Sequence, residues 1–102
     1  MNLLLDTRVL IWCFESNKRL KESVRELLAD SDNNIFVSAV STWELSMKAA
    51  LGKITMPEDF EVQRERCNFK PLPISIQHTL VVKELPDHHR DPFDRLLIAQ
   101  AL

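Results

Sequence analysis

Short apolar runs alternate with helical periodicities along the whole chain. Residues 3–5 form a continuous leucine run, which is typical of a strand buried on both faces of a parallel sheet. Apolar residues then recur at helical spacing, first with Val9, Trp12 and Cys13 and again over residues 20–28. Asn33-Asn34 predicts a turn, and residues 35–37 predict the next strand. The first third of the chain therefore predicts the order strand, helix, helix, strand.

The next segment predicts the helix with the clearest ends. A cap at Ser38 or Ser41 begins it, and Gly52, the only glycine, ends it. The large apolar residues at helical spacing are expected to share the buried face of this helix: Val40, Trp43, Met47, Ala50 and Leu51.

Prolines delimit the C-terminal part of the chain. Pro57 opens a more polar helix that reaches about residue 68, and residues 71–74 predict only a short edge strand, because two prolines lack ladder donors. Ser75 begins a helix that ends near Leu85, and Asp91-Pro92 begins the last one. The alternation of strands and helices predicts one α/β domain over residues 1–102, built on a parallel sheet with right-handed crossovers.

Composition limits the function only weakly. The formal net charge of -2 gives no general attraction to nucleic acid, so any phosphate contact must come from a local basic patch or a metal. Cys13 and Cys67 do not form a CxxC motif, and both are expected to be reduced packing residues. The apolar run before Asp6 is too short for a signal peptide or a membrane span, so a soluble cytoplasmic protein is expected.

Acidic residues follow the strands and open the last helix. Asp6 comes directly after the first strand, Glu44 is expected in the first turn after the second strand, and Asp91 and Asp94 start the last helix. In open α/β sheets ligands bind beyond the carboxyl ends of the strands, so these side chains are expected to converge there. Converging carboxylates repel one another unless a cation lies between them.

The type of ligand selects the metal and the chemistry. Oxygen ligands without a cysteine or histidine cluster favour Mg²⁺ or Mn²⁺, and such ions keep water molecules and bind phosphate. The corresponding reaction is hydrolysis of a phosphodiester, with the metal polarising the phosphate and activating water. His78, His88 and His89 fit no zinc motif and are interpreted as loop residues.

Each carboxylate also has a purely structural explanation. Asp6 can cap the first helix, and Glu44 stands three residues after Ser41, which is the spacing of a capping box. Asp91 and Asp94 favour a helix N-terminus through capping and the helix dipole. Local sequence leaves both interpretations open.

Three segments of the chain resemble one known family in order, spacing and length. LLLDTRVLIW at residues 3–12, VSAVSTWELSMKAALGKI at residues 37–54 and HHRDPFDRLLIAQAL at residues 88–102 are similar to the VapC-like PIN-domain toxins of bacterial type II toxin–antitoxin pairs. The combination is far more specific than any one short acidic motif.

The resemblance implies an α/β/α sandwich around a parallel sheet and an Mg²⁺- or Mn²⁺-dependent endoribonuclease. Asp6, Glu44 and Asp94 match the three leading acids of the family, which implies that they are catalytic and hold the metal; Asp91 matches a further acidic position and is a fourth candidate ligand. The implied partners are an RNA substrate, a cognate antitoxin and a second copy in a homodimer, with no membrane.

Two departures from the family pattern affect these expectations. Arg8 stands where the family commonly has histidine, which adds a permanent positive charge beside Asp6. Family members continue past the last helix with a further strand, so we expect the domain to be incomplete at its C-terminal end and the strand at residues 3–5 to have an open edge. The alternative function is a catalytically inactive remnant that binds an antitoxin or a sister toxin.

Basic residues near the acidic segments are candidates for substrate binding. Arg8, Lys48, Arg90 and Arg95 could steer RNA into the site, and solvated helix faces explain them equally well. Trp12 and Trp43 are expected to pack in the core rather than stack on bases.

Overall fold

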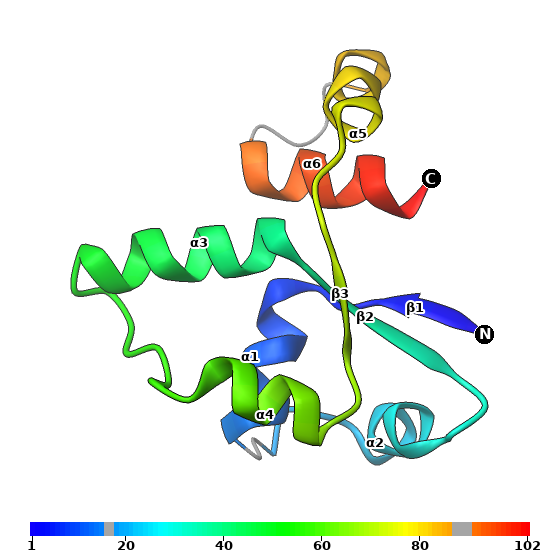
Figure 1. The fold of residues 1–102 in the computed structure, drawn as a ribbon, viewed down its shortest axis with the longest axis vertical. Coiled ribbons are helices and arrows are strands. Elements are labelled where there is room, and N and C mark those ends of the chain that lie inside the picture. Colours follow the sequence, from blue (N-terminus) through cyan, green and yellow to red (C-terminus); the bar gives the residue numbers. More distant parts are fainter. Residues whose placement is uncertain (16–17, 87–90) are drawn as a thin grey trace.

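A three-stranded parallel sheet forms the centre of the molecule. The computed structural model of the chain describes residues 1–15, 18–86 and 91–102 (Figure 1). The strands are β1 (Asn2–Leu4), β2 (Asn34–Ser38) and β3 (Lys70–Leu72), in the order β1-β2-β3. Leu3 pairs with Ile35, and Val37 pairs with Pro71. The predicted parallel sheet is therefore confirmed, with β3 on one of its edges as expected.

Helices flank both faces of this sheet. The elements are α1 (Thr7–Glu15), α2 (Glu22–Ala29), α3 (Ala39–Ala50), α4 (Phe60–Arg66), α5 (Ile76–Val81), the 3₁₀ helix η1 (Val82–Glu84) and α6 (Pro92–Ala101). Figure 1 shows α1, α2 and α4 on one side of the strands and α5 and α6 on the other. Within the described ranges, no helix combines the length and the hydropathy needed to cross a membrane.

The leucine run of β1 contributes to a core on each face of the sheet. Successive strand residues point to opposite faces. Leu5 and Leu3 belong to the larger cluster, which contains Leu10 and Phe60 from α1 and α4. Leu4 packs instead against the smaller cluster of buried residues Val40, Leu96 and Leu97. The prediction that this strand is covered on both sides is therefore confirmed, and helices on two faces make the domain a layered α/β fold.

Caps define the helix ends largely as the sequence predicts. The Ser38 side chain accepts a hydrogen bond from the backbone N–H of Val40 at the start of α3, and Gly52 follows the end of that helix with φ 75°. Ser75 and His78 form a capping box at the start of α5. α4 begins only at Phe60, three residues after Pro57, and Asp59 occupies its N-cap position without a side-chain capping hydrogen bond. The helix expected to open at Pro57 is therefore shorter than predicted.

The two thiols are free, and their packing differs. Cys13 packs against the larger core cluster, whereas Cys67 is exposed. Burial, and next the neighbouring Cys67, raise the pKa of the Cys13 thiol, and burial likewise raises the pKa of Cys67. A raised pKa keeps both side chains protonated and weakly nucleophilic near neutral pH. The prediction of a packing role holds for Cys13 and is wrong for Cys67.

The buried face of α3 differs from the predicted one. Its buried residues are Val40, Ser41, Glu44 and Leu45. Val40 is buried as predicted, but other side chains expected inside are exposed, with Trp43 at 49%, Met47 at 45% and Leu51 at 68%. Trp43 makes an edge-to-face contact with Phe93 at a centroid distance of 4.7 Å rather than entering the core. The prediction failed because small or paired polar residues fit the tight space beside α1 and α6 better than large apolar ones.

Gln100 in α6 connects the carboxyl ends of two strands. Its side-chain oxygen accepts a short hydrogen bond from the Ser38 hydroxyl at the end of β2. Its nitrogen donates to the carbonyl of Pro73, just after β3, and lies 3.3 Å from Nδ1 of His78 in α5. One amide therefore fixes α6 over this edge of the sheet.

We expect Gln100→Ala to lower the free energy of unfolding by about 1–3 kcal/mol, because it leaves partly buried polar groups without partners. The matched control is Gln77→Ala on the exposed surface of α5, which should change stability by less than about 0.5 kcal/mol. Urea denaturation of both variants measures the difference. Equal effects would show that the Gln100 hydrogen bonds do not stabilise this edge.

Candidate functional site

Asp6 lies at the carboxyl end of β1, as predicted. The backbone N–H of Leu5 still donates to the carbonyl of Phe36 at 3.0 Å, so pairing with β2 continues to the residue before Asp6. The Asp6 carbonyl then accepts from the backbone N–H of Leu10 at 3.0 Å, which starts the hydrogen-bond pattern of α1. The Asp6 side chain is exposed. The strand-to-helix junction thus presents this carboxylate to solvent.

Asp94 is presented by the first turn of α6. The Asp91 side chain caps this helix, because its Oδ1 accepts from the backbone N–H groups of Phe93 at 2.8 Å and Asp94 at 3.2 Å. Pro92 occupies the first turn, as the Asp91-Pro92 signal predicts. Capping accounts for Asp91 without a metal. The carboxylate of Asp94, one turn further on, is exposed.

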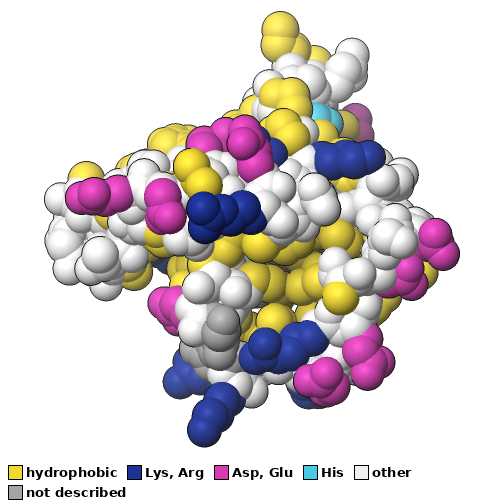
Figure 2. Space-filling view, turned by 60° about the horizontal axis from the view of Figure 1, so that its bottom comes forward, with side chains coloured by type: hydrophobic (Ala, Val, Ile, Leu, Met, Phe, Trp, Pro, Cys, Tyr) yellow, Lys and Arg dark blue, Asp and Glu magenta, His cyan; other side chains and the backbone are white. Residues whose placement is uncertain are grey.

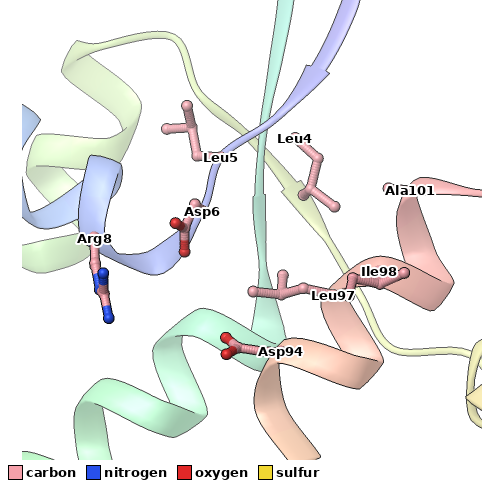
Figure 3. A pocket seen from close by; sticks show the side chains of 8 residues that line it. All are labelled: Leu4, Leu5, Asp6, Arg8, Asp94, Leu97, Ile98 and Ala101. Atoms are coloured by element: carbon pink, nitrogen blue, oxygen red, sulfur yellow. The ribbon is translucent and has the colours of Figure 1, made fainter. Parts of the chain in front are cut away.

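Asp6 and Asp94 line the same cleft. This acidic cleft has a volume of about 410 Å³ and is formed by Leu4, Leu5, Asp6, Arg8, Asp94, Leu97, Ile98 and Ala101. Figure 3 shows both carboxylates pointing into the space between the start of α1 and the start of α6, with Arg8 projecting beside Asp6. Leucine, isoleucine and alanine side chains form the rest of the wall. The carboxyl edge of the sheet therefore brings together two of the predicted acids and one predicted cation.

α3 joins the two elements that carry these carboxylates. The Ser41 hydroxyl lies 2.9 Å from the Thr7 hydroxyl in a buried contact, next to Asp6 in the sequence. The Trp43 ring contacts the ring of Phe93, next to Asp94. The first two turns of α3 therefore fix the start of α1 and the start of α6 relative to each other.

Glu44 is placed differently from the prediction. It lies in the second turn of α3, not the first, and its side chain is buried. Its Oε2 accepts from the Lys48 ammonium at 2.6 Å, while Oε1 is buried and has no hydrogen-bond partner among the described residues. The capping-box interpretation is wrong, because Ser38 is the N-cap and Ser41 bonds to Thr7. Glu44 is not one of the cleft-lining residues.

The expected convergence of three carboxylates is therefore only partly observed. Asp6 and Asp94 share the cleft, whereas Glu44 is engaged by Lys48. Over residues 1–15, 18–86 and 91–102, no three Asp, Glu, His or Cys side chains are close enough to hold a metal together.

The donor chemistry nevertheless fits a hard divalent cation. The two cleft carboxylates supply only oxygen atoms, which suit Mg²⁺ or Mn²⁺. Oε1 of Glu44 is buried without a hydrogen-bond partner among the described residues, but Glu44 does not line this cleft. Asp6 and Asp94 are therefore the residues that would hold such an ion.

The candidate substrate-binding cations differ in their surroundings. Arg8 is exposed and lines the acidic cleft. The Arg95 guanidinium donates to the carbonyls of Val82, Pro86 and Leu85, which ties α6 to η1 and favours a structural role. Arg90 lies outside the described residues. Figure 2 shows cations and anions mixed around a hydrophobic area on one face rather than a continuous basic surface.

Thr7 and Ser41 are site residues that the sequence reasoning assigned no contact. The sequence predicts Ser41 as a possible helix cap and gives no role to Thr7. The available signal was the helical spacing that places Ser41 one turn before Glu44, on the same face. Their buried hydroxyl contact is long-range, so local sequence could not pair them.

The fold is an α/β domain with two carboxylates in a cleft at the carboxyl edge of a parallel sheet, which is where open α/β sheets bind their ligands. Residues 3–102 match the PIN domain family, so the chain belongs to that family. Membership indicates a nuclease, and PIN domains generally depend on divalent metal. Neither the curated proteins nor the solved structures include a significant match.

We expect Thr7→Val and Ser41→Ala each to lower the free energy of unfolding by about 1–3 kcal/mol, because each leaves one buried hydroxyl without its partner. The double variant should lose less than the sum of the two, since it removes both members of the pair. Urea denaturation of the four proteins gives the coupling energy. Strictly additive losses would mean that this hydrogen bond does not join α1 to α3.

Proposed function

We propose that the protein is a metal-dependent endoribonuclease that hydrolyses RNA phosphodiester bonds and acts as the toxin of a toxin–antitoxin pair. The observation that carries the proposal is the shared cleft, in which Asp6 and Asp94 face the same space beside Arg8 in a PIN domain. Carboxylates that gather a divalent cation, next to an arginine that binds phosphate, are suited to phosphodiester hydrolysis. The resemblance of the three segments to ribonuclease toxins supports the choice of RNA.

The roles follow from position and chemistry. Asp6 and Asp94 would hold the ion in the cleft. Glu44 does not line the cleft, and only the family resemblance makes it a candidate ligand. Mg²⁺ or Mn²⁺, when bound, polarises the phosphate and makes a water molecule a better nucleophile. Arg8 can donate two parallel hydrogen bonds to phosphate oxygens, which positions the RNA backbone. Leu97 and Ile98 form part of the apolar wall of the cleft.

An alternative function has separate support in the exposed apolar residues of α3. Trp43, Met47 and Leu51 follow one another at intervals of four residues, so they share one side of the helix and remain accessible. Exposed aromatic and methionine side chains are common in protein interfaces. In this proposal the chain is catalytically inactive and binds a cognate antitoxin or a second copy of itself.

We expect Mg²⁺ or Mn²⁺ to raise the melting temperature, because the ion binds the cleft carboxylates only in the folded state. A free-ion concentration about 100 times Kd stabilises a protein by about 2.7 kcal/mol. The shift should disappear in Asp6→Asn and Asp94→Asn and persist in Asp32→Asn, an exposed residue beyond α2. Differential scanning calorimetry with and without the ion measures it. An unchanged shift in both cleft variants would place the ion elsewhere.

We expect the purified chain to cleave single-stranded RNA with Mn²⁺ or Mg²⁺, and Asp6→Asn to reduce the rate at least about 100-fold, since a metal ligand matters at least as much as an outer-shell partner. Fluorescent RNA oligonucleotides of mixed sequence report the cleavage, with Asp32→Asn as the matched control. Wild-type protein that binds the ion but leaves RNA intact would favour the binding-module alternative.

A further inference from the structure

The two edges of the sheet differ in how they are protected. In the sheet that the described residues form, β1 and β3 are the outer strands. β3 carries the exposed residues Lys70 and Pro71, and both a charged side chain and a residue without an N–H group discourage pairing with a further strand. β1 has the sequence Asn-Leu-Leu and contains neither a charge nor a proline. The edge formed by β1 therefore lacks the features that prevent pairing.

The hydrogen bonds to β2 show which backbone groups of β1 face outward. The carbonyl of Met1 and the N–H of Leu5 are both bonded to β2, at 2.8 Å and 3.0 Å. Alternate residues of a paired strand direct their backbone groups to opposite sides, so Leu3 also bonds toward β2. The N–H and C=O groups of Asn2 and Leu4 therefore point away from β2, along the outer edge of the sheet.

Both faces of this outer strand belong to the hydrophobic cores. Leu3 packs against the larger cluster and Leu4 against the smaller one, and both side chains are only partly buried. A strand that is apolar on both faces is typical of the interior of a sheet rather than of its edge. A further strand beside β1 would cover more of both leucine side chains and satisfy the outward backbone groups.

Charge determines the direction in which a second copy of β1 could pair. Asp6 follows β1 directly and is exposed. In a parallel pair the two Asp6 carboxylates would lie at the same end and repel each other, because like charges on neighbouring strands are unfavourable. An antiparallel pair centred on Leu3 places them at opposite ends, about 20 Å apart at a rise of about 3.4 Å per residue. Antiparallel pairing is therefore the compatible direction.

We propose that β1 forms an interface with a second copy of this chain, in which the two β1 strands pair antiparallel about a two-fold axis at Leu3. Asn2 of each copy exchanges both backbone hydrogen bonds with Leu4 of the other, so every outward backbone group of β1 gains a partner. The two sheets become one continuous sheet. This interface differs from the exposed apolar residues of α3 and requires neither a bound metal nor RNA cleavage.

The first test removes one outward donor from the proposed interface. Asn2→Pro deletes the outward N–H and leaves the bonds to β2 in place. Asn2→Ala is the matched control, because both variants lose the side-chain hydrogen bond from Asn34 to Asn2, but alanine keeps the N–H. Trp43→Ser tests the exposed surface of α3. Sedimentation equilibrium measures the Kd of the dimer, and circular dichroism shows whether each variant is folded.

We expect wild type to form a concentration-dependent dimer, and Asn2→Pro to raise its Kd at least about tenfold, since one of the two hydrogen bonds in each Asn2–Leu4 pair is lost. Asn2→Ala and Trp43→Ser should keep the Kd within about threefold of wild type, as is usual for surface substitutions away from an interface.

The second test uses a disulfide and needs no proline. In a chain with Cys13→Ser and Cys67→Ser, Leu3→Cys places two cysteines opposite each other with about 4.5 Å between their Cα atoms, which is within disulfide range. Oxidised glutathione should convert this variant into a covalent dimer on a non-reducing gel. Asn2→Cys in the same background is the control and should stay monomeric on the gel, because the residue opposite it is Leu4.

Three results would overturn the proposal. The first is a wild-type chain that remains monomeric at every concentration measured. The second is a Kd that Trp43→Ser raises and Asn2→Pro does not, which would place the interface on α3. The third is a Leu3→Cys variant that forms no more covalent dimer than Asn2→Cys, and this result decides the matter if Asn2→Pro does not fold. None of them bears on metal binding or RNA cleavage, so the proposed function is tested separately.

Discussion

The burial of the first two turns of α3 is the constraint on which the site depends. Val40 and Ser41 are both 0% exposed and Leu45 is 3% exposed, so one face of this part of the helix is buried against the remaining elements. Val40 joins the small core with Leu96 and Leu97 of α6, whereas Leu45 joins the large core with Leu10 of α1. One helix thus packs into both hydrophobic clusters. Because close-packed interiors transmit small displacements, the distance between Asp6 and Asp94 is set by how α3 packs.

The polar residues of this buried region have specific partners, which restrict how α3 can be oriented. Ser38 bonds to Gln100 in α6, Ser41 to Thr7 in α1, and Glu44 to Lys48 in its own helix. A rotation of α3 that buried Trp43 and Met47 would separate Ser41 from Thr7 and leave two hydroxyls without partners, at a cost of about 1–3 kcal/mol for each group. It would also remove Val40 and Leu45 from the two cores. The observed face therefore combines this burial with the Ser41–Thr7 contact and leaves Trp43 and Met47 at the surface.

The choice of the buried face of α3 marks the limit of prediction from sequence. Helix ends were predictable at Ser38, Gly52, Ser75 and Asp91, since a cap depends on residues within one turn of itself. The positions of two strands were partly predictable. The leucine run of β1 indicates a strand covered on both faces, and the two prolines near β3 indicate an edge strand. The face of α3 was not, because it depends on a partner of Ser41 that lies 34 positions away. Hydrophobic periodicity predicts that Trp43 rather than Ser41 is buried, and it contains no information about a hydrogen-bond partner elsewhere in the chain.

The candidate site was likewise only partly predictable from the sequence. Asp6 and Asp94 could be brought together from the sequence, since parallel strands end at one edge and the last helix starts there. Glu44 is the third acid of the family resemblance, but its side chain is buried, whereas those of Asp6 and Asp94 are exposed. Two exposed carboxylates remain hydrated and can capture a hydrated cation with little reorganisation, whereas a buried carboxylate must always have a counter-charge. That charge comes from Lys48, one turn along the same helix, whose Nζ lies 2.6 Å from Oε2 of Glu44. The buried acid is therefore neutralised within α3, whereas the two exposed acids remain open to solvent in the cleft.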